Sequence, residues 1–315
     1  MKTLAFLLLP SFSTLCLANA IEPLRAANTL AGSALYRWHV ISADGSGVAS
    51  SSHIRVDVDG GLDDMTRCDA LFVVASYDFG RATTAAFNTQ LRRAARRAVI
   101  LGGLDTGAWM LASLGLLDGY RATVHWQELT RLEEAFPDVR FSPERYVIDR
   151  DRITAGGATT VLDLMLGLIR THHGEALTIE VMRLFLYDTE QSAETPQRGT
   201  LATPLMARRP DVARAIKVME DALETPLALP EVARRAGCSQ RQLERHFAAV
   251  LGQTPQRYYR ILRLTAARRL LQETGLKMPE IAERTGFSSA SVFSRAFRGH
   301  YGHPPGRARR LGRGA

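Results

Sequence analysis

A glycine-bounded segment, Gly103-Leu104-Asp105-Thr106-Gly107, has the spacing of a nucleophile elbow, a tight turn that joins a strand to a helix. The glycines let the turn tighten, so that the side chain of residue 105 would stand above the sheet at the start of the helix. Asp105 occupies the position where a Ser or Cys nucleophile would lie. A carboxylate there predicts an attacking group in an ester-forming hydrolase, a charge that binds a ligand, or an ordinary helix cap.

A second pattern indicates DNA binding. The segment LPEVARRAGCS at residues 229–239 is repeated as MPEIAERTGFS at 278–288, and the match continues downstream with one inserted residue. Each copy predicts a short helix, a left-handed turn at Gly237 or Gly286, and a second helix whose first turn is capped by Ser239 or Ser288. Such a helix-turn-helix places its second helix in the major groove. A helical bundle whose repeat reflects duplication alone is the alternative.

The second helix of each copy has an apolar face that would anchor it. Leu243 and Phe247 in the first copy, and Phe293 and Phe297 in the second, are spaced i,i+4. The apolar-striped helix at 258–274 lies between the copies and would be about 26 Å long. It would hold the two recognition helices about 34 Å apart, which is one turn of DNA.

The charge distribution fits a polyanionic partner for the repeated segment. Residues 208–315 contain 21 Lys and Arg against 9 Asp and Glu, a net charge of +12. The first 207 residues contain 19 basic and 23 acidic residues, a net charge of −4. Double-stranded DNA is therefore the expected partner of the C-terminal part.

The elements that would position these residues fall into two classes. Short β-rich runs alternate with helical patterns up to about residue 185, which predicts a mostly parallel sheet with helices on both faces, a flavodoxin-like sandwich. An all-α domain with two helix-turn-helix motifs follows, so the fold class is α/β followed by all-α. The expected domains are 1–187 (sensor), 188–208 (linker) and 209–315 (DNA-binding). The expected strands are 3–9, 36–42, 70–76, 97–103 and 145–157, and the expected helices are 17–32, 85–96, 107–117, 126–136 and 159–174.

The N-terminal segment MKTLAFLLLPSFSTLCLANA resembles a signal peptide, with Lys2, an apolar run and an Ala-Asn-Ala sequence. We interpret the run instead as a buried strand, because secretion would remove the first strand of the sheet and export a DNA-binding domain. No other segment approaches the roughly 20 apolar residues of a membrane span. The three cysteines are far apart, so we expect neither a disulfide framework nor a metal site, and a cytoplasmic location fits.

The repeated segment closely resembles the DNA-binding domain of the AraC/XylS regulators over about the last 100 residues. The resemblance rests on S-x-R-x-L-x-R-x-F from Ser239 to Phe247, on G-x-x-P from Gly252 to Pro255, and on GFSSASVFSRAF from Gly286 to Phe297. Ala308 departs from the family, which usually has an aromatic residue there. The positions that match the family's base-reading residues are Arg241, Glu244 and Arg245 in the first copy, and Ala290, Ser291, Ser294 and Arg295 in the second.

Residues 1–185 resemble the PfpI-like branch of the class I glutamine amidotransferase superfamily. The resemblance rests on the elbow, on the segment GLLDGYRATVHW and on the turn Ala155–Gly157. The family's catalytic members have Cys at the elbow and a nearby His, which His125 matches. Because Asp105 replaces the Cys, thiol chemistry is absent. The resemblance implies a regulator that senses a ligand, and some similar regulators respond to quaternary amines such as betaine or carnitine, or to arginine.

The expected ligand site favours a cation. Glu22 matches the family's acidic residue near the elbow, and with Asp105 it would form a pair of carboxylates. Arg25 or His125 would hold a carboxylate at the other end of the ligand. The candidate walls of an aromatic cage for a methylated ammonium group are Phe12, Tyr77, Phe79, Trp109 and Trp126, although the two tryptophans also have spacings typical of core residues.

The sequence thus predicts a ligand-responsive, sequence-specific transcription regulator rather than an enzyme. We expect it to activate catabolic genes for a small nitrogenous cation, to form a homodimer, and to contact RNA polymerase. No cofactor is expected. The alternative is a hydrolase-like enzyme that uses Asp105 and carries a secondary DNA-binding tail.

Overall fold

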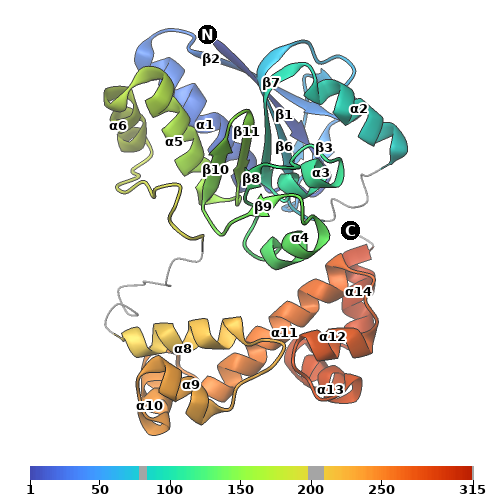
Figure 1. Ribbon diagram of the computed structural model, residues 1–315, viewed down its shortest axis with the longest axis vertical. Coiled ribbons are helices and arrows are strands. Elements are labelled where there is room, and N and C mark those ends of the chain that lie inside the picture. Colours follow the sequence, from blue (N-terminus) through green and yellow to red (C-terminus); the bar gives the residue numbers. More distant parts are fainter. Residues whose placement is uncertain (78–83, 198–208, 314–315) are drawn as a thin grey trace. The chain divides into compact units, whose positions relative to one another are not determined.

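The computed structural model describes residues 1–77, 84–197 and 209–313. The chain divides into two compact units, Met1–Arg198 and Gly199–Ala315. The first unit is an α/β sandwich and the second consists of helices only (Figure 1). Both classes of domain agree with the expectation from the sequence.

The first unit is built on a seven-stranded sheet with the strand order β10-β11-β7-β6-β1-β2-β5. Its neighbouring strands are parallel except for β10 and β11, which form an antiparallel hairpin at one edge. The sheet strands are β1 (Lys2–Leu8), β2 (Tyr36–Ser42), β5 (Gly60–Gly61), β6 (Cys68–Ala75), β7 (Ala98–Asp105), β10 (Tyr146–Asp149) and β11 (Arg152–Ala155). Two further pairs are β3 (Val48–Ala49) with β4 (Arg55–Val56), and β8 (Arg121–Ala122) with β9 (Arg140–Phe141).

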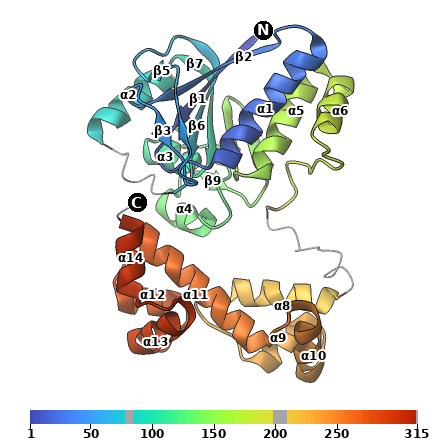
Figure 2. The same ribbon diagram turned by 180° about the vertical axis from the view of Figure 1, so that it is seen from behind.

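Helices cover both faces of this sheet (Figures 1 and 2). One apolar core lies between the sheet and α1 (Thr14–Ala31), α5 (Thr159–His173) and α6 (Glu175–Leu184). The other lies between the sheet and α2 (Ala85–Ala95), α3 (Gly107–Ser113) and α4 (Leu129–Ala135). The pattern of the sequence predicted five of these helices and missed α6. The layers hold the carboxyl ends of the parallel strands in fixed register, which is where ligand sites of such folds form.

The apolar run near the N-terminus is a strand in the middle of the sheet, as predicted. β1 pairs in parallel with β2 on one side and with β6 on the other. Residues 4–8 are at most 4% exposed, because their side chains alternate between the two cores. A strand buried on both faces requires such a continuous apolar run.

The segment that the sequence assigned to a linker begins later than expected. Up to Gln197 the chain lies on the α/β unit, where Glu190 forms an ion pair with Arg170 and the carbonyl of Ala193 accepts from the Arg145 N–H. The Gln197 side chain accepts from the Trp126 N–H at 2.9 Å and donates to the carbonyls of Val124 and Glu144, each at 2.8 Å. The remainder of the expected linker, 198–208, lies outside the described residues.

The second unit contains two helix-turn-helix lobes that share one long helix (Figure 1). The N-terminal half of α11 packs in the apolar core of the first lobe, and its C-terminal half packs in the core of the second. A helix buried at both ends in this way fixes the two lobes relative to each other. The helices are α8 (Pro210–Asp221), α9 (Leu229–Ala236), α10 (Gln240–Leu251), α11 (Pro255–Glu273), α12 (Met278–Arg284), α13 (Ala290–Tyr301) and α14 (Pro305–Arg313).

The last helix forms despite the departure from the family at Ala308. This side chain is 2% exposed and belongs to the apolar core of the second lobe. None of the helices in the described part of the chain is long and apolar enough to cross a membrane.

Candidate DNA interface and effector site

The first recognition helix, α10, is held by a cap at its start and by two apolar side chains along one face. The Ser239 hydroxyl accepts from the Gln242 N–H, and the Gln242 side chain accepts from the Ser239 N–H at 2.9 Å, which completes a capping box. Leu243 and Phe247 are fully buried. The helix therefore keeps a fixed rotation about its axis and presents one polar face outward.

That outer face carries the three residues predicted to read bases in the first copy. Arg241 and Arg245 are exposed, and Glu244 is half-buried and accepts from the Gln240 amide at 2.9 Å. Beside them, His246 Nδ1 is hydrogen-bonded to the carboxyl of Asp211 in α8 at 2.5 Å, which connects the two helices. The exposed guanidinium groups of Arg241 and Arg245, the latter 3.5 Å from His246 Nε2, can donate to an acceptor-rich surface such as the major-groove edge of guanine.

The second recognition helix, α13, starts one residue later than the sequence predicted. Ser289, not Ser288, caps it by accepting from the Val292 N–H at 3.2 Å. The inserted residue therefore lies in the turn, before the helix. Phe293 and Phe297 are fully buried, as expected.

The predicted base-reading residues of the second copy lie on the outer side of α13. Ser291 and Arg295 are exposed, whereas Ala290 and Ser294 are half-buried. The turn before this helix needs glycine, because Gly286 has a φ of +68° and a Cβ there would lie 2.2 Å from Pro226. Both lobes thus present a helix of the same construction with a polar outer face.

In the first unit, β7 ends at Asp105 and α3 begins at Gly107, which is the strand-turn-helix arrangement that the glycine spacing predicted. Asp105 has a φ of +60°, a left-handed conformation that is strained for a residue with a side chain. The turn is tight enough that a Cβ on Gly107 would lie 2.1 Å from the Val73 carbonyl oxygen. The sequence therefore folds here into an elbow.

The Asp105 carboxyl is nearly buried rather than projecting into solvent. It is 9% exposed, and its Oδ2 accepts from the Ser76 hydroxyl at 2.7 Å. Burial raises the pKa of Asp105 to about 7; the Ser76 hydrogen bond opposes the shift, and the negative charge of Glu128 adds to it. The site therefore holds a carboxyl group whose charge changes near neutral pH.

The second carboxylate is not the one the sequence indicated. Glu22 lies on α1 with its side chain 49% exposed and forms an ion pair with Arg25 at 2.7 Å. The acid whose charge acts on Asp105 is Glu128, which is 6% exposed and pairs with Arg131 at 3.3 Å. Arg25 and Glu22 pair with each other on the exposed surface of α1, so neither lies with the buried carboxyls of Asp105 and Glu128.

The expected aromatic cage is not assembled as a set. Phe12 is fully buried in the core between the sheet and α1, where no ligand reaches it. Trp109 packs edge-on against Phe136 with ring centroids 5.3 Å apart, and the Arg131 guanidinium lies 4.3 Å over its ring. Tyr77 is 55% exposed and directly follows Ser76, and Phe79 lies outside the described residues.

His125 and Trp126 lie beside the elbow. The His125 N–H donates to the Asp105 carbonyl at 3.4 Å, and the rings of His125 and Trp126 are 5.6 Å apart. Both side chains are half-buried. Of the predicted ligand-binding residues, Asp105, His125, Trp126 and Tyr77 are the ones that the described structure connects to the elbow.

Three residues that matter at this site were not singled out from the sequence. Ser76 directly follows β6, and since β6 and β7 are parallel neighbours, the sequence could have indicated that Ser76 lies near Asp105. Glu128 resembles an ordinary residue at a helix start, and Gln197 lies in a polar segment with no periodicity. For these two, only the three-dimensional contacts give a signal.

Together, the two units define a class of protein: an α/β domain with a modified elbow, followed by a pair of helix-turn-helix lobes. A model of the DJ-1/PfpI family matches residues 5–171, and a helix-turn-helix domain model matches residues 232–311. The chain therefore belongs to the AraC-type helix-turn-helix transcriptional regulators that carry a DJ-1/PfpI domain.

Similar proteins of known sequence or structure agree with this family. The HTH-type transcriptional regulator GbdR of Pseudomonas aeruginosa is 40% identical over 304 residues, which cover 96% of this chain and 83% of the relative. The HTH-type transcriptional regulator CdhR of the same species is 41% identical, with 96% and 90% covered. A solved AraC family transcriptional regulator from Pseudomonas putida has a TM-score of 0.54 and 28% identity, over 59% of this chain and 100% of that one.

Proposed function

We propose that this regulator binds a specific DNA site through both recognition helices and that a small cationic effector controls its activity. The observation that carries the DNA-binding part is the pair of capped helices, α10 and α13, each anchored by two buried apolar side chains with polar residues outside. The proposed base-reading residues are the seven named above from the sequence. The proposal includes action in the cytoplasm, as a homodimer that contacts RNA polymerase.

Selection of binding sites from a random DNA pool tests this proposal. The selected site should contain two short motifs about one helical turn apart. Arg245→Ala and Arg295→Ala should each weaken binding to that site by about 1–3 kcal/mol and relax the preference at one base pair. Binding to scrambled DNA should change much less, because phosphate contacts dominate it. Two variants that keep the full preference of the parent would refute the assignment of these residues.

The effector part of the proposal rests on the charge around Asp105. A cation near this carboxyl and the buried Glu128 would lower the cost of ionising Asp105. Trp126 and Tyr77 adjoin the elbow and offer aromatic faces to a methylated ammonium group. The proposed effectors are therefore quaternary amines of the betaine and carnitine type, or arginine, and the controlled genes would serve their catabolism.

Thermal-shift screening of betaine, carnitine, arginine and related amines tests the effector class. A ligand that binds the folded chain raises its melting temperature with the logarithm of its concentration. Asp105→Asn should reduce that shift, because the neutral amide attracts a cation less. A response to anions, with none to any amine, would contradict the electrostatic argument.

The proposal assigns to Gln197 the coupling between effector binding in the α/β unit and DNA binding in the second unit. It lies at the end of the described α/β unit, and its side chain is bonded to the backbone of Trp126, next to His125 and the elbow. An effector that moves Trp126 would break or strengthen this contact and so change how Gln197 is held at the end of the α/β unit. The coupling requires that the effector bind the two arrangements with different affinity.

Gln197→Ala tests this route. The variant should keep effector binding and DNA binding, but the factor by which effector changes DNA affinity should fall toward one. Gln191→Ala is a matched control in the same segment, since the structure shows only its backbone N–H bonded, to Asp163 at 3.2 Å. If the coupling factor is unchanged in Gln197→Ala, the contact between Gln197 and Trp126 does not mediate the coupling.

We propose further that the α/β unit does not act as an enzyme. Burial favours the neutral form of the Asp105 carboxyl although the Ser76 hydrogen bond opposes it, and a neutral carboxyl is a poor nucleophile. Assays with amide and ester substrates test this directly. Turnover that disappears in Asp105→Asn would establish the hydrolase alternative.

A further inference from the structure

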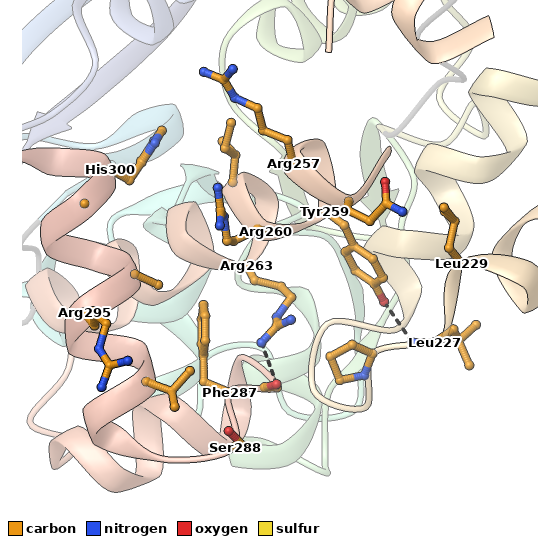
Figure 3. A pocket seen from close by; sticks show the side chains of 17 residues that line it. Leu227, Leu229, Arg257, Tyr259, Arg260, Arg263, Phe287, Ser288, Arg295 and His300 are labelled. Carbon is orange, nitrogen blue, oxygen red and sulfur yellow. Dashed lines mark hydrogen bonds between the residues drawn. The ribbon is translucent and has the colours of Figure 1, made fainter. Parts of the chain in front are cut away.

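A groove opens inside the second unit, between its two helix-turn-helix lobes (Figure 3). Its volume is about 920 Å³. One wall is the N-terminal half of α11, the facing wall is one side of α13, and the loop before α9 and the turn before α13 close its ends. The groove is therefore built by the same two helices that connect and carry the recognition surfaces.

The walls of this groove carry an uncompensated positive charge. The charge comes from Arg257 and Arg260 of α11 and from Arg295 of α13, all three of them exposed. No Asp or Glu is among the seventeen lining residues. In the part of the chain that the structure describes, none of the three arginines forms an ion pair. Like charges held close together favour a polyanionic ligand.

Arg263, the remaining arginine of the groove, has a different role. It donates to the carbonyls of Thr285 at 2.7 Å and Gly286 at 2.5 Å, and its guanidinium lies 4.1 Å over the Phe287 ring. These contacts hold the turn before α13 against α11. Arg263 is therefore a structural residue, and the available charge of the groove belongs to the other cations.

We propose that the groove binds the sugar–phosphate backbone of the DNA segment that lies between the two major-groove contacts. This inference rests on the proposed DNA-binding function. Arg295 belongs both to the outer face of α13 and to the groove wall, so a duplex held by α13 passes the mouth of the groove. A duplex that spans both recognition helices must cross the segment between them.

The spread of the cations favours a duplex over a small anion. Arg257 and Arg260 lie on successive turns of α11, and Arg295 lies on the facing wall formed by α13. The charges are thus spread over two facing helices rather than gathered at one point that would bind a single phosphate. B-DNA presents one negative charge per about 1.7 Å of its axis, and such a row of phosphates matches cations spread along a groove.

Salt dependence of DNA binding by the full chain tests the inference. The double variant Arg257→Gln/Arg260→Gln should make the negative slope of log K against log salt concentration shallower by about 1.8, since each lost phosphate contact removes about 0.9 from its magnitude. Its preference for the selected site over scrambled DNA should stay within about twofold of the parent, because backbone contacts carry no sequence information. The charge-preserving pair Arg257→Lys/Arg260→Lys should retain most of the slope.

Arg268→Gln is the matched control, because Arg268 is an exposed arginine of α11 that does not line the groove. It should leave the slope close to that of the parent. The inference is overturned if the Gln pair has the slope of this control while its helical content and melting temperature match the parent. If the parent itself shows no preference for any DNA site, the proposed function fails. If that preference exists and only the slope prediction fails, the groove assignment alone is wrong.

Discussion

The buried carboxyl at the elbow predicts a specific pH dependence of stability. The pKa of Asp105 is about 7 in the folded chain against an ordinary value of 3.8. Below pH 3.8 the group is protonated in both folded and unfolded chains. As the pH rises from 3.8 to 7, the unfolded chain loses this proton first, so the group's contribution to stability is lost over that window. Above pH 7 the contribution no longer changes.

Asp105→Asn removes this titration, and so the variant should gain stability relative to the parent as the pH rises. Each pKa unit corresponds to 1.36 kcal/mol, so the full shift amounts to about 4 kcal/mol. Between pH 5 and pH 7 the difference in unfolding free energy between variant and parent should change by about 2 kcal/mol, because the folded group is itself half ionised at pH 7. Replacement of the carboxyl by an amide, whose one oxygen is a weaker acceptor for the Ser76 hydroxyl, adds an offset that does not depend on pH.

Urea unfolding followed by Trp fluorescence measures this difference in the full chain. All three tryptophans, Trp38, Trp109 and Trp126, lie in the α/β unit, so the signal reports on that unit alone. Asp138→Asn on the exposed surface corrects for the general effect of removing one negative charge. A variant-to-parent difference that stays constant within about 0.5 kcal/mol from pH 5 to pH 8 would refute the assignment of a raised pKa to Asp105.

Three further predictions concern effector binding, the cap of α13 and the packing of the elbow. The affinity of a cationic effector should rise as the pH increases through about 7, because a cation binds the ionised form of Asp105; calorimetric titration at pH 6 and pH 8 would detect the change and the released proton. Ser289→Ala should destabilise the second unit by about 1 kcal/mol, measured by thermal unfolding of the full chain, whereas Ser288→Ala should have little effect; the reverse order would contradict the cap seen here. Gly107→Ala should cost at least about 2 kcal/mol in urea unfolding, because the added methyl group has no room beside Val73, and a neutral substitution would show that the elbow is looser than described.

The sequence by itself determined the features that depend on local periodicity and spacing. The duplicated segment, the left-handed turns at Gly237 and Gly286, and the buried pairs in α10 and α13 all follow from residues a few positions apart. The glycine spacing of 103–107 likewise specified the elbow. These features could be predicted because one turn of helix or one tight turn sets the geometry.

The tertiary structure decided which side chains meet around Asp105. Glu128 rather than Glu22 supplies the second carboxyl, and Phe12 lies in the core, because long-range packing determines which residues of separate elements become neighbours. The docking of Gln197 and the charged groove between α11 and α13 also join segments far apart in the chain. Such contacts depend on the free energy of the whole packed unit, which no local pattern of residues encodes.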